Sequence, residues 1–205
     1  MIGIINYGMG NLASIQNALN YLQIDSAIFS DPREIQKYDK LILPGVGAFG
    51  SAMTNLDTIG FTPRIREVID RGKVPLLGIC LGMQLLLESS MEHGYHKGLG
   101  LVGGKVLFLG EKISNLPLPH VGWNDLLIRS GTRLLKGLPN QSSFYFVHNF
   151  YCRVTDESVV TGTTEYGFPF ATVLESGNIF GCQFHPEKSQ KSGLIILRNY
   201  GDMAC

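Results

Sequence analysis

Cys80 stands between two glycines at the end of an apolar run, in the segment Leu76-Leu77-Gly78-Ile79-Cys80-Leu81-Gly82-Met83-Gln84. The Gly-x-Cys-x-Gly spacing is the thiol version of a nucleophile elbow, where a strand reverses sharply into a helix. Glycines on both sides remove the Cβ atoms that would clash in such a turn. Because the turn exposes one side chain and frees the next backbone N–H for an oxyanion, the pattern predicts a nucleophilic cysteine. A buried core cysteine is the alternative interpretation of the motif alone.

A nucleophilic thiol needs a base, and His185 has the most suitable setting among the five histidines. It follows the β-rich run Ile179-Phe180-Gly181-Cys182, which predicts a position at the rim of a sheet. Glu187 lies two residues further on, beyond Pro186, so both side chains fall on one side of an extended segment. The carboxylate can then orient the imidazole, and the three residues predict a thiol triad. An ordinary loop histidine is the alternative for His185 taken alone.

A second glycine-rich loop, Gly45-Val46-Gly47-Ala48-Phe49-Gly50, fits the G-x-G-x-x-G pattern of dinucleotide-binding proteins. Pro44 precedes it, it follows the third expected strand, and no acidic residue ends a strand about 20 residues later. We therefore favour an anion-binding loop beside Cys80, in which Val46 and Gly47 offer a backbone N–H to an oxyanion. Glycines on both sides of Val46 would let that peptide flip, so that the oxyanion hole is assembled on demand.

The first half of the chain alternates short apolar runs with amphipathic stretches, which is typical of βαβ units. After Gly98 turn residues become frequent and strands shorter, which indicates an antiparallel extension of the same sheet. We expect an α/β fold with a doubly wound, mostly parallel central sheet, in one domain over residues 1–205. The expected strands are Ile2–Ile5, Ser26–Phe29, Lys40–Leu43, Leu76–Ile79, Lys105–Leu109, Phe144–His148, Val159–Thr163, Ala171–Glu175 and Ile179–Gln183. The expected helices begin after Asn11 and after Asp31, and span Phe61–Arg71, Leu81–Glu88 and Ser192–Tyr200.

The composition argues against several classes of function. Lys plus Arg and Asp plus Glu number 17 each, so nothing indicates binding to nucleic acid or to an anionic membrane. The chain begins without a signal-peptide pattern and has no apolar run near the ~20 residues of a membrane span. The cysteines Cys80, Cys152, Cys182 and Cys205 are scattered without metal-ligand spacing. We therefore expect reduced thiols in a cytoplasm, and neither a metal nor a cofactor.

The segments Gly78–Gln84 and Phe184–Ser189 resemble the signatures of class I glutamine amidotransferases, which carry a Cys-His-Glu triad. Further segments narrow the resemblance to the glutaminase subunits of imidazole glycerol phosphate synthases. These segments are Tyr7-Gly8-Met9-Gly10-Asn11, Pro44-Gly45-Val46-Gly47, Pro119-His120-Val121-Gly122-Trp123-Asn124 and Tyr145-Phe146-Val147-His148. The resemblance runs nearly end to end and implies the class I glutamine amidotransferase fold.

The resemblance also implies roles for individual residues. Cys80 matches the nucleophile, His185 the general base and acid, and Glu187 the residue that orients the imidazole. The positions that match the oxyanion hole are Val46, Gly47 and Leu81, and those that match the glutamine pocket are Gln84, Glu92 and His148. The positions that match the surface facing a synthase subunit are Asn11, His120, Trp123, Asn124, Tyr145 and Lys188. The single Trp lies in a polar His-x-Gly-Trp-Asn segment, expected to be a turn, and suits an interface anchor.

The activity implied is hydrolysis of glutamine to glutamate and ammonia through a thioester. The ammonia would pass to a (β/α)8 cyclase in a heterodimer, which makes imidazole glycerol phosphate and an aminoimidazole carboxamide ribonucleotide in histidine biosynthesis. Four positions depart from the family pattern: Asn6 (usually Asp), Phe108 (often Arg), and Asn149 and Phe150 (usually Ser or Thr, then Tyr). They leave open a paralogue that feeds ammonia to a different synthase, for instance in surface-sugar amidination. Two remote alternatives are a cysteine peptidase or chaperone-like protein of related fold, and a dinucleotide-binding module.

Overall fold

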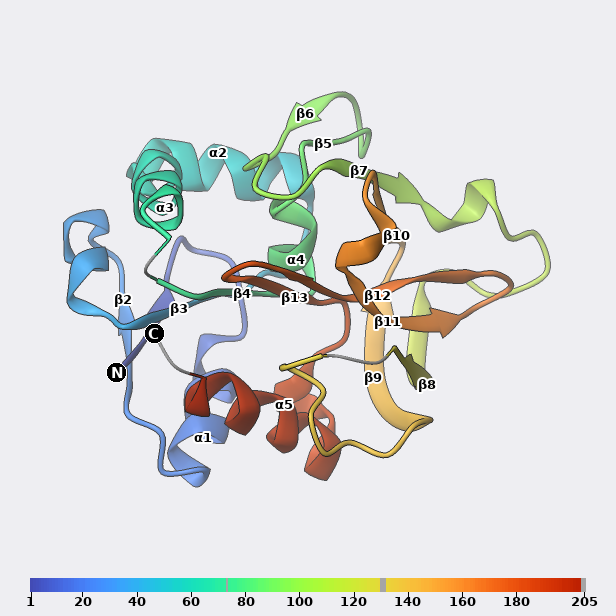
Figure 1. Cartoon of the computed structure of the whole chain (residues 1–205). Coiled ribbons are helices and arrows are strands. Elements are labelled where there is room, and N and C mark those ends of the chain that lie inside the picture. The colour runs from blue at the N-terminus through green and yellow to red at the C-terminus, as the bar shows by residue number, and fades with distance from the viewer. Residues whose placement is uncertain (73, 130–131, 204–205) are drawn as a thin grey trace.

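The computed structural model describes residues 1–72, 74–129 and 132–203, and its central feature is a twisted sheet (Figure 1). Parallel strands form one half of this sheet in the order β2-β1-β3-β4-β13. Their bounds are β1 Ile2–Ile5, β2 Ser26–Phe29, β3 Lys40–Leu43, β4 Leu76–Ile79 and β13 Ile179–Cys182. The order reverses between β1 and β3, and ligands of doubly wound sheets bind near such a reversal, at the carboxyl ends of the strands.

Helices cover both faces of the parallel half. Figure 1 shows α2 (Phe49–Ile59) and α3 (Phe61–Asp70) on one side of the sheet, and α1 (Leu12–Tyr21) and α5 (Gln190–Asp202) on the other. The helices bury apolar stripes against strands that are buried on both faces, which explains the near-continuous apolar runs of β1, β3 and β4. The part of the chain that the structure describes contains no helix that is both long and apolar enough to cross a membrane.

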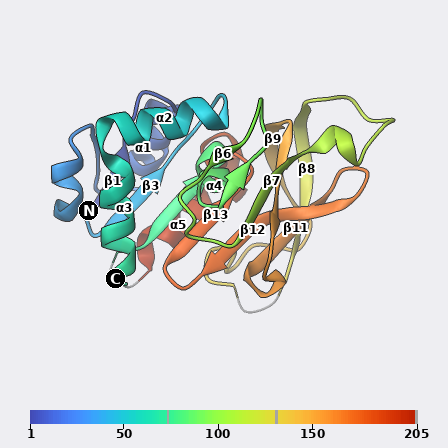
Figure 2. The same ribbon diagram turned by 90° about the horizontal axis from the view of Figure 1, so that it is seen from above.

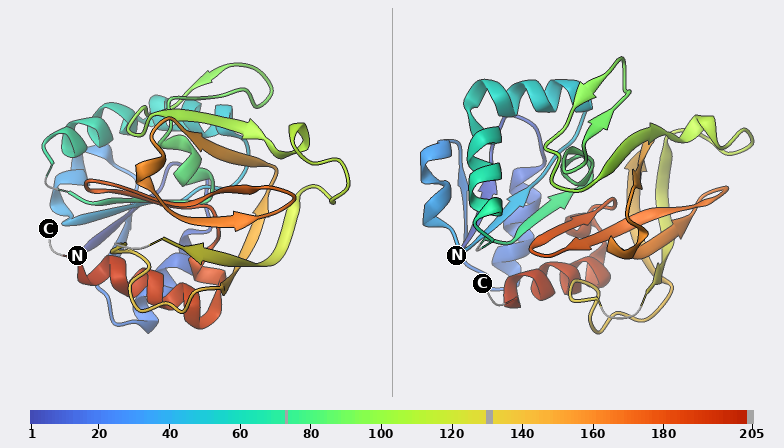
Figure 3. Two further views of the ribbon diagram at one scale, coloured as in Figure 1. Left: turned by 45° about the vertical axis from the view of Figure 1, so that its right-hand side comes forward. Right: turned by 45° about the horizontal axis from the view of Figure 1, so that its top comes forward.

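The other half of the sheet is largely antiparallel and lies at the end of the molecule opposite the chain termini (Figures 2 and 3). Beyond β13 the order is β12-β10-β7-β5-β6, and β11, β8 and β9 continue from β12 in that order. The bounds are β5 Ser89–Ser90, β6 His96–Lys97, β7 Gly104–Phe108, β8 His120–Ile128, β9 Ser142–His148, β10 Phe150–Val154, β11 Val160–Glu165 and β12 Pro169–Ser176. This arrangement confirms the predicted antiparallel extension.

Three predicted elements need correction. The segment from His120 to Asn124, expected to be a turn, is the start of strand β8, because it pairs with β9 in continuous register. Helix α4 ends at Leu85 rather than at Glu88, and a 3₁₀ helix at Pro32–Lys37 replaces the expected helix after Asp31. Asp31 does cap that segment, since its carboxylate accepts a hydrogen bond from the Arg33 N–H at 2.9 Å.

The cysteines are consistent with the expectation of reduced thiols. Cys80, Cys152 and Cys182 form no disulfide, whereas Cys205 lies outside the described residues. Burial raises the pKa of Cys152 and of Cys182, so both side chains stay protonated and unreactive at neutral pH. Cys80 is therefore the described cysteine to consider for chemistry.

Candidate active site

Cys80 occupies the sharp turn that joins strand β4 to helix α4 (Leu81–Leu85). Its backbone has a φ of 54° and a ψ of −111°, a left-handed conformation that non-glycine residues rarely adopt. The Cys80 N–H donates to the carbonyl of Cys182 on the neighbouring strand β13 at 2.8 Å, which holds the turn at the carboxyl end of the sheet. Such strain costs about 1–3 kcal/mol and is typical of functional sites, so the geometry supports the predicted nucleophile elbow.

The two glycines of the motif permit this turn for a steric reason. A Cβ on Gly78 would lie 2.6 Å from the Gly82 carbonyl oxygen. A Cβ on Gly82 would lie 1.9 Å from the carbonyl oxygen of Leu43, at the end of strand β3. The first turn of α4 therefore packs directly on the backbone of the sheet, and only glycine allows that approach.

Replacing Gly82 by alanine is expected to destabilise the fold by about 3 kcal/mol or more, because backbone atoms must move to relieve the overlap. Urea unfolding followed by circular dichroism measures the change. Gly103→Ala is the matched control, since a Cβ there would meet only Thr155, at 3.5 Å and beyond. Equal stability of the two variants would contradict this account of the elbow.

His185 comes to the site from the segment that follows β13, at the start of the 3₁₀ helix Pro186–Lys188. Its backbone N–H donates to the Tyr145 carbonyl on strand β9 at 3.0 Å, and its carbonyl accepts from the Ser189 hydroxyl at 2.7 Å. The ring Nδ1 lies 2.8 Å from Oε1 of Glu187, and both side chains are buried. The predicted orientation of the imidazole by Glu187 is thus present in the structure.

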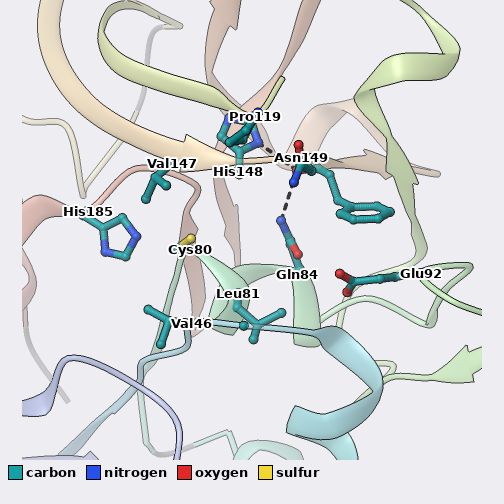
Figure 4. Close-up of a pocket in the computed structure, with 12 residues that line it drawn as sticks. Val46, Cys80, Leu81, Gln84, Glu92, Pro119, Val147, His148, Asn149 and His185 are labelled. Atoms are coloured by element: carbon teal, nitrogen blue, oxygen red, sulfur yellow. Dashed lines mark hydrogen bonds between the residues drawn. The ribbon is translucent and has the colours of Figure 1, made fainter. Parts of the chain in front are cut away.

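The second ring nitrogen of His185 faces the nucleophile. Nε2 is buried and has no conventional hydrogen-bond partner among the described residues, and Figure 4 shows the imidazole beside the Cys80 sulfur. Burial lowers the pKa of His185, but its interactions with Cys80 and Glu187 outweigh burial and raise the pKa to about 10. The neighbouring Cys80 and Glu187 thus favour the protonated imidazole, whose Nε2 is placed to exchange a proton with the sulfur or with a leaving group.

Cys80 and His185 open into a cavity of about 310 Å³ at the junction of the two halves of the sheet (Figure 4). Its lining includes all six residues predicted for the oxyanion hole and the glutamine pocket, namely Val46, Gly47, Leu81, Gln84, Glu92 and His148. Four further residues complete the lining: Pro119, Val147, Asn149 and Phe150. Residues from six separate segments of the chain thus converge on one pocket of small-ligand size.

The loop that begins at Pro44 lies beside the nucleophile, as expected. The buried hydroxyl of Tyr7 donates to the Pro44 carbonyl at 2.8 Å and anchors the start of the loop. Gly47 has a φ of 99°, and the side chain of Val46 is 42% exposed. The Leu81 N–H lies next to this loop, in the first turn of α4, where N–H groups have no intrahelical acceptor.

Gln183 contacts the nucleophile, although the sequence analysis assigned it no role. Its Nε2 donates to the Cys80 sulfur at 3.8 Å, and its Oε1 accepts from Gln84 Nε2 at 3.1 Å. The signal was available, because Gln183 lies two residues before His185 in the motif, on the same side of an extended segment. Gln84 Nε2 also donates to the Phe150 carbonyl at 3.1 Å, so both amide hydrogens of Gln84 are used and its oxygen remains for a ligand.

Most residues predicted to face a partner are at least partly accessible at the surface. Trp123 is 50% exposed and meets Tyr145 edge-on across strands β8 and β9, with ring centroids 6.3 Å apart. The Lys188 ammonium lies 5.7 Å from the Tyr145 ring centroid. Asn11 and Asn124 are half-buried. His120 does not meet the expectation, since its side chain is 3% exposed and turned inward to His148.

One known protein family matches nearly the whole chain. The profile of the family described as "Glutamine amidotransferase class-I" matches residues 3–200, which span both halves of the sheet and all the pocket residues above. The match includes the elbow at Cys80 and the segment with His185 and Glu187.

Curated relatives resemble the chain over nearly its whole length. One is "Imidazole glycerol phosphate synthase subunit HisH" of Moorella thermoacetica, 50% identical over 202 residues, covering 98% of this chain and 94% of the relative. The protein of the same name from Caldanaerobacter subterraneus subsp. tengcongensis is 49% identical over 205 residues, covering 99% and 98% of the two chains.

Solved structures support the same fold at lower identity. The structure titled "Crystal structure of glutamine amidotransferase" superposes with a TM-score of 0.76 at 20% identity, covering 98% of each chain. "Structure of PurLQS from Thermotoga maritima" gives a TM-score of 0.75 at 19% identity, covering 97% of this chain and 96% of the other. At this identity the similarity concerns the fold alone.

Proposed function

Because the chain belongs to the class I glutamine amidotransferase family, we propose that it is the glutaminase subunit of an imidazole glycerol phosphate synthase. It hydrolyses glutamine and supplies ammonia to a cyclase subunit in histidine biosynthesis. The observation that carries this proposal is the Cys80 elbow in the same pocket as His185, whose imidazole is hydrogen-bonded to Glu187. The continuous sheet and the family match over residues 3–200 support a single glutamine amidotransferase domain over residues 1–205.

The reaction begins at the sulfur of Cys80. The thiolate attacks the carboxamide carbon of glutamine, and the oxygen becomes an oxyanion that the N–H groups of Leu81 and of the Val46–Gly47 loop stabilise. The C–N bond breaks as His185 gives its proton to the departing ammonia, which leaves a thioester. His185 then accepts a proton from water, the hydroxide attacks the thioester carbon, and glutamate and the thiolate separate. The raised pKa of His185 suits the acid half of this cycle.

Glutamine is held by the polar residues of the pocket. Oε2 of Glu92 accepts from the Phe49 N–H at 2.6 Å, which fixes the carboxylate and leaves the other oxygen for the substrate ammonium. The free oxygen of Gln84 accepts a second hydrogen bond from the substrate. His148 lines the wall next to the Phe150 carbonyl.

The partner is a (β/α)8 cyclase that docks over the pocket and receives ammonia before bulk water protonates it. Its contact surface includes Asn11, Trp123, Asn124, Tyr145 and Lys188. An exposed Trp beside Tyr and a cation is the composition of an interface anchor. The chain acts in the cytoplasm, which agrees with three free cysteines in the described residues.

The alternatives left open by the sequence receive less support. The departures at Phe108 and Phe150 form one aromatic contact, with centroids 5.4 Å apart, and the full-length similarity to histidine-pathway subunits favours that pathway over sugar amidination. The family match favours the amidotransferase over a peptidase, a chaperone or a dinucleotide-binding module. The loop of the G-x-G-x-x-G pattern lines the Cys80 pocket instead.

Mixing the chain with the cyclase subunit of an imidazole glycerol phosphate synthase is expected to raise glutamate production at least about 100-fold over that of the isolated chain. The physical reason is that one missing oxyanion donor costs roughly 10²–10³ in rate, and we expect the Val46 peptide to provide its N–H only when the partner makes it flip. Glutamate release is measured with and without the cyclase and its substrate ribonucleotide. Equal turnover alone would contradict the gated loop, and stimulation by a sugar-amidating synthase instead would contradict the histidine assignment.

A further inference from the structure

Two buried histidines connect the pocket to strand β8. His120 and His148 are paired across β8 and β9, and His120 Nδ1 lies 2.9 Å from His148 Nε2. On the pocket side, His148 Nδ1 lies 2.8 Å from the Phe150 carbonyl oxygen. On the other side, His120 Nε2 lies 3.2 Å from the amide nitrogen of Asn124. The side chains are 3% and 6% exposed, so water does not replace these contacts.

The ends of this chain of contacts determine where each proton lies. The Phe150 carbonyl can only accept, so His148 carries its proton on Nδ1 and accepts at Nε2. His120 must then donate from Nδ1 and accept at Nε2. The Asn124 amide supplies that last donor, and its other hydrogen goes to the Glu165 carbonyl at 2.9 Å. Each donor in this series of contacts has one acceptor. The hydrogen bonds all point the same way, from Asn124 through the two histidines to the Phe150 carbonyl.

Both imidazoles must be neutral for this arrangement. Burial lowers the pKa of His120 to about 4 and that of His148 to about 3, so neither holds a second proton at neutral pH. The ring of His120 is also held in place by stacking, with centroids 4.0 Å from Tyr166 and 4.8 Å from Phe146. The pair is therefore a rigid polar contact in an otherwise aromatic part of the core.

At the pocket end, the same network reaches the nucleophile. The Phe150 carbonyl accepts a hydrogen bond from Gln84 Nε2 at 3.1 Å as well as from His148. Gln84 in turn donates to Gln183, which donates to the Cys80 sulfur. The position of the Phe150 carbonyl thus sets the orientation of Gln84, which lines the substrate pocket.

We propose that His120 is a positioning residue for glutamine hydrolysis: acting through His148, it holds the Phe150 carbonyl that orients Gln84 in the pocket. This inference rests on the proposed glutaminase function. His120 itself is not among the residues that line the pocket. Strand β8 also presents Val121 and Trp123 on its exposed face. A partner docked on this face would contact the strand that carries His120.

The test compares variants of His120 in the complex with the cyclase. His120→Phe keeps the stacked ring but removes the hydrogen bond to His148, and it is expected to raise the KM for glutamine about tenfold while kcat changes less than threefold. His120→Asn loses the ring but places an amide N–H near the position of Nδ1, and is expected to restore most of the KM. Tyr166→Phe is the matched control, because it removes only the hydroxyl that donates to the Pro117 carbonyl at 2.7 Å.

A second readout does not depend on activity. In ¹⁵N-histidine NMR spectra of the unmodified chain, His120 and His148 are both expected as neutral rings protonated on Nδ1, and the His148 signal is expected to change in His120→Phe. A His148 ring protonated on Nε2 would overturn the proposal, as would an unchanged KM in His120→Phe with a fully active parent enzyme. A larger KM defect in His120→Asn than in His120→Phe would also overturn it, by assigning the effect to packing. An unmodified complex that does not hydrolyse glutamine would overturn the proposed function and this inference with it.

Discussion

Replacing Cys80 by alanine is expected to abolish glutamine hydrolysis, with a loss of roughly 10⁴-fold or more, while ammonia-driven synthesis by the cyclase persists. Without the sulfur no thioester forms, and the remaining pocket only binds glutamine. Alanine retains the Cβ, so the elbow with its φ of 54° keeps its present strain. Glutamate release and product formation from ammonium salts are measured on the same complex.

The matched control for the nucleophile is Cys152→Ala. This thiol is also buried, and burial raises its pKa, but it does not line the pocket. Its loss is expected to leave glutamine turnover within about twofold while lowering stability through the cavity it leaves. Substantial glutamine consumption by Cys80→Ala would contradict the assignment of the nucleophile.

Replacing Glu187 by glutamine is expected to reduce kcat by roughly 10³–10⁴-fold. The carboxylate accepts the Nδ1–H of His185 at 2.8 Å, so it selects the tautomer and stabilises the protonated ring. The amide of the variant can instead donate to Nδ1. The neutral imidazole then carries its proton on Nε2, so Nε2 cannot accept the proton of the Cys80 thiol. The pKa of His185 is raised to about 10 partly by Glu187, and it is expected to fall in the variant.

The sign of the pH effect follows from that shift. Folding raises the pKa of His185 from about 6.5 to about 10. The protonated ring therefore stabilises the fold fully at pH below about 6.5, and this contribution is lost as the pH rises through about 10. Glu187→Gln should therefore flatten the loss of stability on the alkaline side, as measured by denaturation at a series of pH values. Glu67→Gln on the exposed face of α3 is the control, since among the described residues Glu67 forms ion pairs with Arg64 and Arg71 and with no other group. An unchanged His185 titration by NMR, or a kcat within tenfold, would contradict the role given to Glu187.

Local patterns in the sequence were sufficient to predict the nucleophile elbow. Two glycines around Cys80 specify a turn that a Cβ would block, and apolar runs before it specify a buried parallel strand. The His185–Glu187 contact is also local, because a spacing of two in an extended segment places both side chains together. These features depend on residues close in the chain, so backbone sterics and side-chain periodicity determine them.

The tertiary structure alone decided how the antiparallel half completes the site. The sequence predicts a turn at His120–Asn124, which is the first part of strand β8 in the structure. Pairing with β9 makes this segment a strand whose residues alternate between a buried and an exposed face. That pairing turns His120 inward to His148 and leaves Trp123 outside. Gln183 likewise meets Cys80 only because β13 pairs with β4.

The difference has a physical reason. Turn sterics and the two-residue repeat of a strand are properties of the local backbone, and they can be read from neighbouring residues. Which strands pair, and which face of a strand is buried, depends on burial and hydrogen bonding between segments that are distant in the chain. The contact between His185 and Glu187 and the turn at Cys80 could thus be predicted from the sequence, whereas the hydrogen bonds that link His120, His148 and Gln84 to the Phe150 carbonyl depend on the folded sheet.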